Sequence, residues 1–187
     1  MQRSYKKFAL IGTSCTGKTT LIKDLSLLLK KEYAKKDIAV VPEAARLYFG
    51  AFQVKNPFSY KHQRNVQLLA RQLEIYTQEH FGDIVLTDRS VVDAIAYVWA
   101  MGDRKGAKRL IKLMEDWFES YDHIFLLDPA GISYKTDKVR KESAKTRDKF
   151  HKAFLTVLPH LSSSWKLISG SKNRRLQTML KIIYRSS

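Results

Sequence analysis

Eight consecutive residues near the N-terminus have the spacing of a phosphate-binding loop. Gly12 to Thr19 reads G-x-x-x-x-G-K-T and directly follows the apolar run from Phe8 to Ile11. Two glycines at this spacing let backbone N–H groups turn toward an anion, and the N-terminus of the following helix adds its positive dipole end. The motif therefore predicts a site for the phosphates of a nucleoside triphosphate, formed by Gly12, Thr13, Ser14, Cys15, Thr16, Gly17, Lys18, Thr19 and Thr20.

Two residues of this loop have side chains suited to phosphoryl transfer. Lys18 is expected to reach the β- and γ-phosphates, and the Thr19 hydroxyl is expected to bind a Mg²⁺ ion that bridges them. The predicted cofactors are therefore ATP and Mg²⁺. The alternative is an ordinary glycine-rich turn, but the leucines at 21, 25, 28 and 29 keep the helical spacing that the motif requires behind it.

An acidic residue, Glu43, follows the apolar run of residues 38–41 and Pro42. An acid at this position can orient an attacking hydroxyl or accept its proton, so Glu43 is the candidate for work on the acceptor. The alternative is that it caps the next helix. Arg46 is expected to assist Glu43 or bind an anion, with a plain ion pair as the alternative.

Asp88 and Arg89 follow the third apolar run, residues 84–86, and Thr87. The carboxylate of Asp88 is predicted to emerge beside the phosphate loop, where a contact to Mg²⁺ is needed, or else to cap the helix that starts near Ser90. Arg89 is expected to hold the acceptor or to pair with Asp88. The candidate metal-binding residues are thus Thr19 and Asp88.

A basic segment at about residues 129–148 lacks apolar periodicity and is predicted to form a lid. Guanidinium groups that fold over the phosphates would stabilise the charge spread over their oxygens while water is excluded. Arg140 and Arg147 are the candidates, with Lys141 behind them. The alternative is a solvated helical face with ion pairs along it.

The elements that must position these residues alternate along the chain. Strands are predicted at 8–11, 38–41, 84–86, 123–127 and 165–168. Helices are predicted over 18–34, 59–81, 91–101 and 173–184, with further helices around Leu110 to Phe118 and Phe150 to Leu158. This order predicts an α/β fold of the P-loop NTPase type, a three-layer sandwich in which a five-stranded parallel sheet has helices on both faces. Residues 1–187 are interpreted as a single domain.

Composition agrees with a globular domain in a reducing compartment. Of the 187 residues, 44% are hydrophobic and 28% charged, and the one cysteine excludes an internal disulfide. That cysteine, Cys15, is expected to be a filler in the loop, with a redox sensor as the alternative. No stretch approaches the roughly 20 apolar residues that span a bilayer, so a cytoplasmic protein is expected.

The formal net charge of +16 favours acidic partners. Nucleotide phosphates, nucleic acid and anionic lipid all qualify, and a solvated basic surface is the plain alternative. A small nucleoside-like acceptor is the expected partner, and both a nucleic-acid partner and a homo-oligomer stay open.

Four segments, 12–19, 41–46, 87–97 and 137–143, together resemble the P-loop ATPase/kinase family that includes ribosylnicotinamide kinase domains. The chain is similar, more distantly, to deoxynucleoside and thymidylate kinases. The resemblance implies that Glu43 contacts the acceptor hydroxyl, that Asp88 and Arg89 serve metal and acceptor, and that two lid arginines clamp the phosphates. It also implies that three residues of the long helix face the acceptor pocket: His62, Gln63 and Gln67.

The predicted function is ATP-dependent, Mg²⁺-assisted phosphoryl transfer by a kinase to a nucleoside, ribosylnicotinamide or nucleoside monophosphate. One alternative is a regulatory protein that binds GTP or ATP. A guanine-reading Asn-Lys-x-Asp segment does not occur in the sequence, which disfavours the GTP form. A second alternative is a P-loop protein that binds nucleic acid or phosphorylates its ends.

Overall fold

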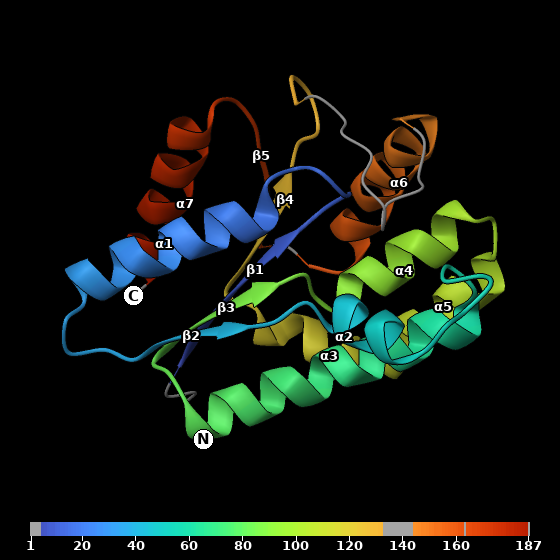
Figure 1. The fold of residues 1–187 in the computed structure, drawn as a ribbon, viewed down its shortest axis with the longest axis horizontal. Helices are drawn as coiled ribbons and strands as arrows, with labels where there is room; N and C mark the ends of the chain where they lie inside the picture. The colour runs from blue at the N-terminus through green and yellow to red at the C-terminus, as the bar shows by residue number, and fades with distance from the viewer. Residues whose placement is uncertain (1–4, 133–143, 163, 187) are drawn as a thin grey trace.

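Five parallel strands form a sheet in the order β2-β3-β1-β4-β5 (Figure 1). The computed structural model describes residues 5–132, 144–162 and 164–186. Within them the strands are β1 (Lys6–Ile11), β2 (Ile38–Val41), β3 (Ile84–Asp88), β4 (His123–Leu127) and β5 (Trp165–Ile168). The central strand β1 pairs in parallel with both β3 and β4. The predicted five-stranded parallel sheet is confirmed, with each strand where an apolar run predicted it.

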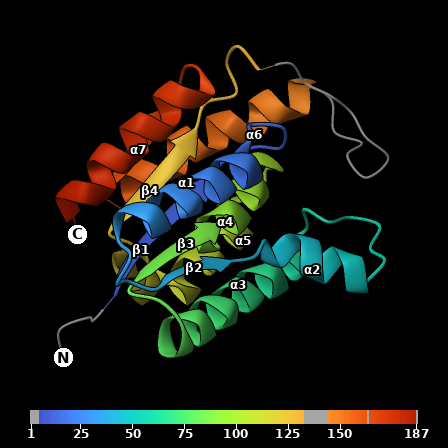
Figure 2. The ribbon, with the colours of Figure 1, turned by 60° about the vertical axis from the view of Figure 1, so that its left-hand side comes forward.

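Helices cover both faces of the sheet, as Figure 2 shows. One face carries α1 (Lys18–Glu32) and α7 (Lys172–Ser186), and the other carries α3 (Tyr60–His80), α4 (Val91–Ala100), α5 (Arg104–Leu113) and α6 (Ala144–Val157). Alternate β1 side chains enter the two layers: Phe8 and Leu10 pack with α1 and α7, while Ala9 and Ile11 pack with α4 and α6. The predicted three-layer sandwich is therefore confirmed.

Helix α4 is apolar along most of its length because other helices surround it. It packs against α3, α5 and α6 as well as the sheet layer, and nine of its ten residues are buried. Ser90 caps it: the Ser90 hydroxyl accepts from the Val92 N–H, and the Asp93 carboxylate accepts from the Ser90 N–H at 2.9 Å. The first turn of α4 is thus rigidly placed at the end of β3.

Two helical segments differ from the sequence prediction. Residues 44–51, for which no separate helix was predicted, form α2 (Ala44–Ala51), which buries Ala44 alone and therefore carries little apolar periodicity. The predicted break at residues 102–106 is shorter than expected, because the Asp103 carboxylate accepts from the Gly106 N–H at 2.7 Å and starts α5 at Arg104. Two short 3₁₀ helices, Glu115–Ser120 and Leu158–His160, follow α5 and α6. None of the helices within the described ranges combines the length and apolar character that a bilayer span needs.

Candidate active site

The backbone of the loop between β1 and α1 adopts conformations that require glycine at both glycine positions of the motif, Gly12 and Gly17. Gly12 has a φ of 129°, and a Cβ there would lie 3.1 Å from the Leu127 carbonyl oxygen. Gly17 has a φ of 81° and occupies the N-cap of α1. Because side chains disfavour both conformations, the motif glycines are explained by backbone geometry.

Lys18 is folded back across this loop. Its Nζ donates to the Gly12 and Thr13 carbonyl oxygens at 3.0 and 2.6 Å and contacts the Thr16 hydroxyl at 3.3 Å. Burial, together with the positive charge of Arg89, lowers the pKa of Lys18 to about 7. The carboxylates of Asp93, Asp88 and Glu43 oppose this shift without cancelling it, and a phosphate group in the loop would raise the pKa further.

A cleft of about 380 Å³ lies over the loop. It brings loop residues 14–20 together with Glu43, Arg46, Arg89 and Ile132. A second cleft, of about 360 Å³, adjoins it at Thr16, Gly17 and Thr20 and extends to residues 170–172. Together the two clefts surround the first turn of α1 with space of the size that small ligands occupy.

Asp88 and Thr19 form a site whose chemistry fits a magnesium ion. The Thr19 hydroxyl donates to Asp88 Oδ2 at 2.9 Å, and the buried Asp88 Oδ1 has no hydrogen-bond partner among the described residues. Mg²⁺ is commonly held by one carboxylate, water and substrate phosphates, rather than by an all-protein cage. In the described part of the chain no group of three or more His, Cys, Asp or Glu side chains could hold a metal alone. Since Ser90 caps α4, the alternative role of Asp88 as that cap is wrong.

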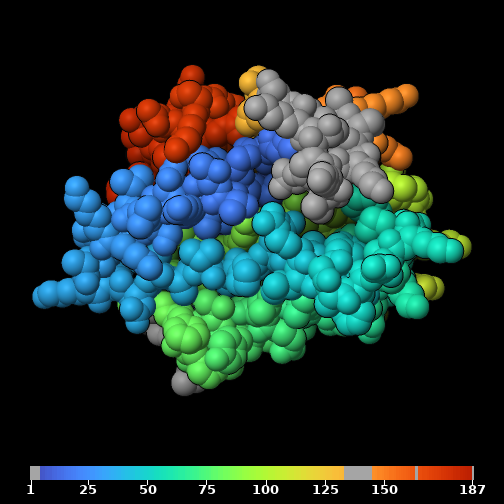
Figure 3. Space-filling model, viewed as in Figure 1, coloured from blue at the N-terminus to red at the C-terminus, as the bar shows by residue number. Residues whose placement is uncertain are grey.

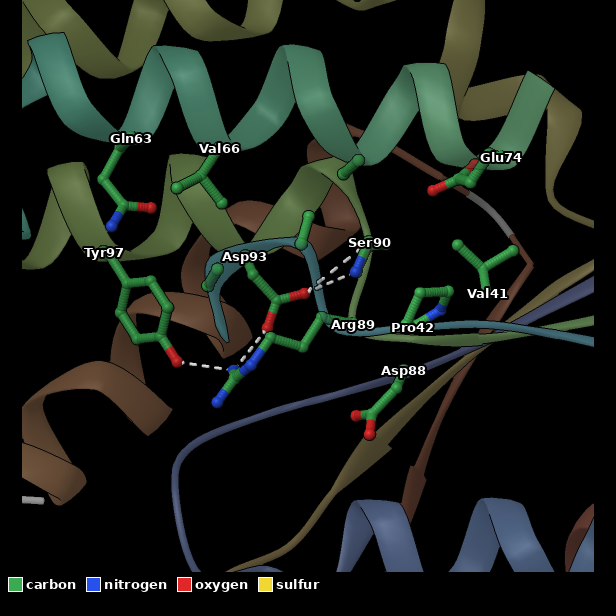
Figure 4. Close-up of a pocket in the computed structure, with 13 residues that line it drawn as sticks. Val41, Pro42, Gln63, Val66, Glu74, Asp88, Arg89, Ser90, Asp93 and Tyr97 are labelled. Atoms are coloured by element: carbon green, nitrogen blue, oxygen red, sulfur yellow. Dashed lines mark hydrogen bonds and ion pairs between the residues drawn. The ribbon is translucent and has the colours of Figure 1, made fainter. Parts of the chain in front are cut away.

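Arg89 joins the loop to three other side chains. Its Nε donates to Glu43 Oε1 at 2.6 Å, and its Nη1 donates to the Gly12 carbonyl oxygen at 2.9 Å. The same Nη1 donates to Asp93 Oδ1 at 2.9 Å and to the Tyr97 hydroxyl at 2.7 Å, as Figure 4 shows. Its backbone φ of 78° is uncommon for a residue with a side chain. The guanidinium therefore links the first loop residue to an acid after β2 and to α4.

Asp93 and Tyr97 are site residues that the sequence analysis missed. Asp93 is buried, and its carboxylate serves both the Ser90 N–H and Arg89. Burial raises the pKa of Asp93 above its usual range, although Arg89 and Lys18 oppose the shift. The available signal was the S-x-x-D capping pattern, with a tyrosine four residues further on the same helix face. Arg89 thus pairs with Glu43 and Asp93, and the alternative pairing with Asp88 is not formed.

Glu43 sits at the N-cap of α2, but its side chain makes no capping hydrogen bond. Its carboxylate instead pairs with Arg89 at 2.6 Å and with the exposed Arg46 Nη2 at 3.4 Å. Burial raises the pKa of Glu43, but the charge and hydrogen bond of Arg89 outweigh it and keep the pKa below its usual value. The carboxylate is therefore ionised, and of its two alternative roles the one as a side-chain cap is wrong.

Within the described residues, the three long-helix residues have different surroundings. Gln63 donates to the Pro57 carbonyl oxygen at 2.8 Å and lines a cavity of about 20 Å³ beside Arg89, the size of one water molecule (Figure 4). Gln67 is fully buried and donates to the Val91 carbonyl oxygen at 2.9 Å, which anchors the start of α4. His62 Nδ1 lies 3.0 Å from the Tyr48 hydroxyl of α2.

Of the two predicted lid arginines, the structure describes Arg147 alone. Arg140 lies outside the described residues, as does most of the lid. Arg147 lies on α6 and donates to the Ile132 carbonyl oxygen at 3.2 Å, beside a cavity of about 520 Å³ that includes Asp128 and His151. Since Ile132 also lines the loop cleft, Arg147 lies next to that cleft without lining it.

Arg175 on α7 is a third residue near the loop that the sequence did not predict. It is buried and donates from Nε to the Gly170 carbonyl oxygen and from Nη2 to the Asp128 carbonyl oxygen, both at 2.8 Å. Its Nη1 donates to the Thr16 carbonyl oxygen at 3.3 Å. The residue therefore ties the phosphate loop to the ends of β4 and β5, yet nothing in the sequence separates it from its basic neighbours.

Comparisons with known proteins agree with this geometry. A family model described as an AAA domain matches residues 7–175. The crystal structure of NadR protein in complex with NAD and AMP-PNP has a TM-score of 0.73 at 16% identity, with 97% of this chain and 49% of that chain covered. The crystal structure of NadR protein in complex with NR has a TM-score of 0.74 at 16% identity, with 98% and 50% covered. The chain thus spans about half the length of these solved chains, and the shared fold confirms the predicted fold class. A search among curated proteins found no match to this sequence.

Proposed function

The chain belongs to the AAA domain family, and from this premise we propose that it transfers the γ-phosphate of ATP to a small nucleoside-like acceptor with the help of Mg²⁺. The observation that carries the proposal is the position of an ionised Glu43 at the phosphate loop, bridged to the Gly12 carbonyl by one guanidinium. NadR protein, which shares the fold, binds AMP-PNP with NAD, or NR, in the structures compared. These complexes support a nucleoside-like acceptor. The proposal takes residues 1–187 as one domain with a basic lid at about 129–148.

In this proposal the triphosphate lies in the loop, where Lys18 turns from the loop carbonyls to the β- and γ-phosphates. Thr19 and Asp88 would hold Mg²⁺ together with phosphate oxygens and water. When bound there, the ion would neutralise negative charge on the phosphates. Positioning and electrostatics, rather than covalent chemistry by the protein, then supply most of the rate enhancement.

The acceptor hydroxyl is proposed to hydrogen-bond to the Glu43 carboxylate, which orients it in line with the γ-phosphate. Because Arg89 and Arg46 hold this carboxylate ionised, it can accept a hydrogen bond but is a weak base by itself. Arg89 would steady the acceptor, and Arg147, with Arg140 of the lid, would approach the phosphates on closure. Gln63, beside Arg89, is the best placed of the long-helix residues for contact with the acceptor.

The test is incubation of the purified protein with labelled ATP, or GTP, and a panel of nucleosides, nucleoside monophosphates, ribosylnicotinamide and 5′-hydroxyl oligonucleotides. We expect label in a small acceptor. Lys18→Ala should lower turnover by at least about 100-fold, and Glu43→Gln by about 10²-fold or more with nucleotide affinity nearly unchanged. The matched control Glu79→Gln, an exposed acid on α3, should leave turnover unchanged. Tight nucleotide binding without transfer to any acceptor would contradict the kinase assignment and identify a regulatory nucleotide-binding protein.

A further inference from the structure

Helix α5 has a continuous cationic face. Half of its ten residues are exposed cations: Arg104, Lys105, Lys108, Arg109 and Lys112. At about 100° per residue these side chains fall within an arc of about 140°. The buried residues of the helix, which include Ala107 and Leu110, lie on the opposite side. The apolar face of α5 packs into the core, and its exposed face carries the five cations.

This arrangement is electrostatically unfavourable in the isolated domain. Three pairs of like charges are spaced i, i+4, such as Lys105 with Arg109, and such pairs oppose each other on a helix surface. Arg104 and Lys105 also stand in the first turn, where the helix dipole disfavours cations. Within the described residues none of the five cations forms an ion pair. The neighbouring acid, Asp103, instead accepts a hydrogen bond from the Gly106 N–H. An external anion would remove this repulsion.

The cationic face continues onto the start of α3. The Arg109 guanidinium lies 6.0 Å from the centre of the Tyr60 ring, and the exposed Arg64 is one helical turn from Tyr60. The Arg104 guanidinium lies 3.8 Å from the centre of the half-buried Trp99 ring. Arg109 thus lies over a ring of α3 and Arg104 over a ring of α4, and the exposed cations of α5 and the start of α3 form one surface, the α3–α5 surface.

We propose that this α3–α5 surface binds the sugar-phosphate backbone of a nucleic-acid strand. Cations one turn apart along α5, such as Arg104 and Lys108, are separated by about 6 Å of helix rise, comparable with successive phosphates along a strand. A membrane fits less well, because a helix lying in a bilayer buries an apolar face and that of α5 is already buried in the core. This surface is separate from the candidate active site, because Arg89 precedes the first residue of α4 whereas α5 follows its last. Binding there would therefore be a property additional to phosphoryl transfer.

The test measures fluorescence anisotropy of labelled 20-nucleotide single strands of DNA and RNA, and of a duplex, at several salt concentrations. The variant replaces Lys105, Lys108 and Lys112 by glutamine, which keeps helix propensity and leaves both ring-stacked arginines in place. We expect the Kd for a strand to rise at least about 10-fold at low salt. The salt slope should fall by about two, because each neutralised phosphate of a single strand contributes about 0.7.

The matched control replaces three exposed lysines of the opposite helical layer by glutamine: Lys30, Lys31 and Lys181. Figure 3 shows α1 and α7 on the left of the face in view, while α4 and α5 reach its surface at the right-hand edge. This variant has the same net charge, and its Kd should stay within about 3-fold of the original protein. Circular dichroism and ATP binding check that each variant is folded. If the triple variant does not fold, Lys108→Gln alone replaces it and is expected to raise the Kd about 3-fold.

Three results would overturn the proposal. The first is no binding of any oligonucleotide by the original protein at low salt. The second is an equal loss of affinity in both triple variants, which would mean that only total charge matters. The third is loss of binding to phosphatidylserine vesicles, but not to oligonucleotides, in the α5 variant, which would assign the surface to a membrane.

Discussion

Arg89 is the residue on which the candidate site depends. Its backbone has a φ of 78°, a conformation that costs free energy for a residue with a side chain and that concentrates at functional sites. In return the guanidinium reaches the Gly12 carbonyl, Glu43 and Asp93 from one position. The acid after β2 and the phosphate loop are therefore held at a fixed separation, which in-line transfer requires.

Asp93 should prove to be a positioning residue for Arg89. Asp93→Asn places an amide donor against either the Arg89 Nη1 or the Ser90 N–H, so we expect turnover to fall by about 10- to 100-fold. Steady-state kinetics with the acceptor that the labelling panel identifies would measure the effect, and Asp116→Asn, at an exposed position, is the control. A folded Asp93→Asn protein with unchanged turnover would show that the contact is structural only.

Lys18 should take up a proton when a nucleoside triphosphate binds. The pKa of Lys18 in the free protein is about 7, so near pH 8 the amine is mostly neutral, and the phosphates raise its pKa again. Calorimetry in buffers of different ionisation enthalpy should show uptake approaching one proton per nucleotide near pH 8 and much less near pH 6, where Lys18 is already charged. Lys18→Arg, which stays protonated at both pH values, gives the baseline. Equal uptake in both proteins would refute the shift.

At the scale of elements, the phosphate loop is held by contacts from the far end of the chain. The buried Arg175 of α7 reaches three carbonyl groups, those of Thr16, Asp128 and Gly170. Each belongs to a different connection at the carboxyl edge of the sheet, after β1, β4 and β5. One side chain outside any motif therefore joins these three connections, and it also lines the second of the two clefts around α1.

Replacing Arg175 by lysine should loosen the loop. A lysine keeps the charge, but its single ammonium cannot donate to three separate carbonyls with the geometry of the guanidinium. We expect nucleotide affinity to fall by about 10-fold, which titration of a fluorescent ATP analogue would measure. Arg174→Lys, at the exposed neighbouring position, should change affinity by less than about 2-fold. Equal affinities for the two variants would mean that the loop is held without Arg175.

At the scale of the whole molecule, a buried ion pair joins the sheet to α3. Lys7 Nζ of β1 lies 2.8 Å from Glu74 Oε2, and both side chains are almost fully buried. Glu74 also accepts from Trp117 Nε1 at 2.8 Å and from the Tyr121 hydroxyl at 2.7 Å. Lys7 Nζ is 4.2 and 4.3 Å from the centres of the same two rings. Every charge in this group is thus satisfied by another element of the fold.

Breaking this pair on one side should destabilise the protein strongly. Lys7→Met leaves the Glu74 carboxylate buried without its counter-charge, so we expect the free energy of unfolding to fall by about 3–5 kcal/mol. Urea denaturation would measure it. In the double variant Lys7→Met/Glu74→Gln the total loss should be smaller than the sum of the single losses.

The neighbouring pair of Lys6 and Asp122 provides the control for this prediction. It is longer, at 3.4 Å, and the Lys6 side chain is 44% exposed. Lys6→Met should therefore cost less than about 1 kcal/mol. Two results would contradict the stabilising role assigned to burial. One is a double-variant loss in the free energy of unfolding equal to the sum of the Lys7→Met and Glu74→Gln losses. The other is an equal loss for Lys6→Met and Lys7→Met.

The sequence by itself determined the fold class, the five strands and the phosphate loop. These features depend on local patterns: apolar runs, helical spacing, and two glycines whose positive φ the loop requires. It also placed Glu43, Asp88 and Arg89 at one edge of the sheet, because the ends of parallel strands meet there. In the structure these three side chains lie beside the loop.

Only the tertiary structure determined which hydrogen-bond and ion-pair partners these side chains have. Arg89 pairs with Glu43 and Asp93 rather than with Asp88, and the buried Gln67 donates to the Val91 carbonyl oxygen at the start of α4. Such choices depend on distances between elements that are far apart in sequence, so no spacing rule encodes them. Arg175 shows this most clearly, because its three carbonyl partners come together only when β4, β5 and the loop are assembled in one sheet.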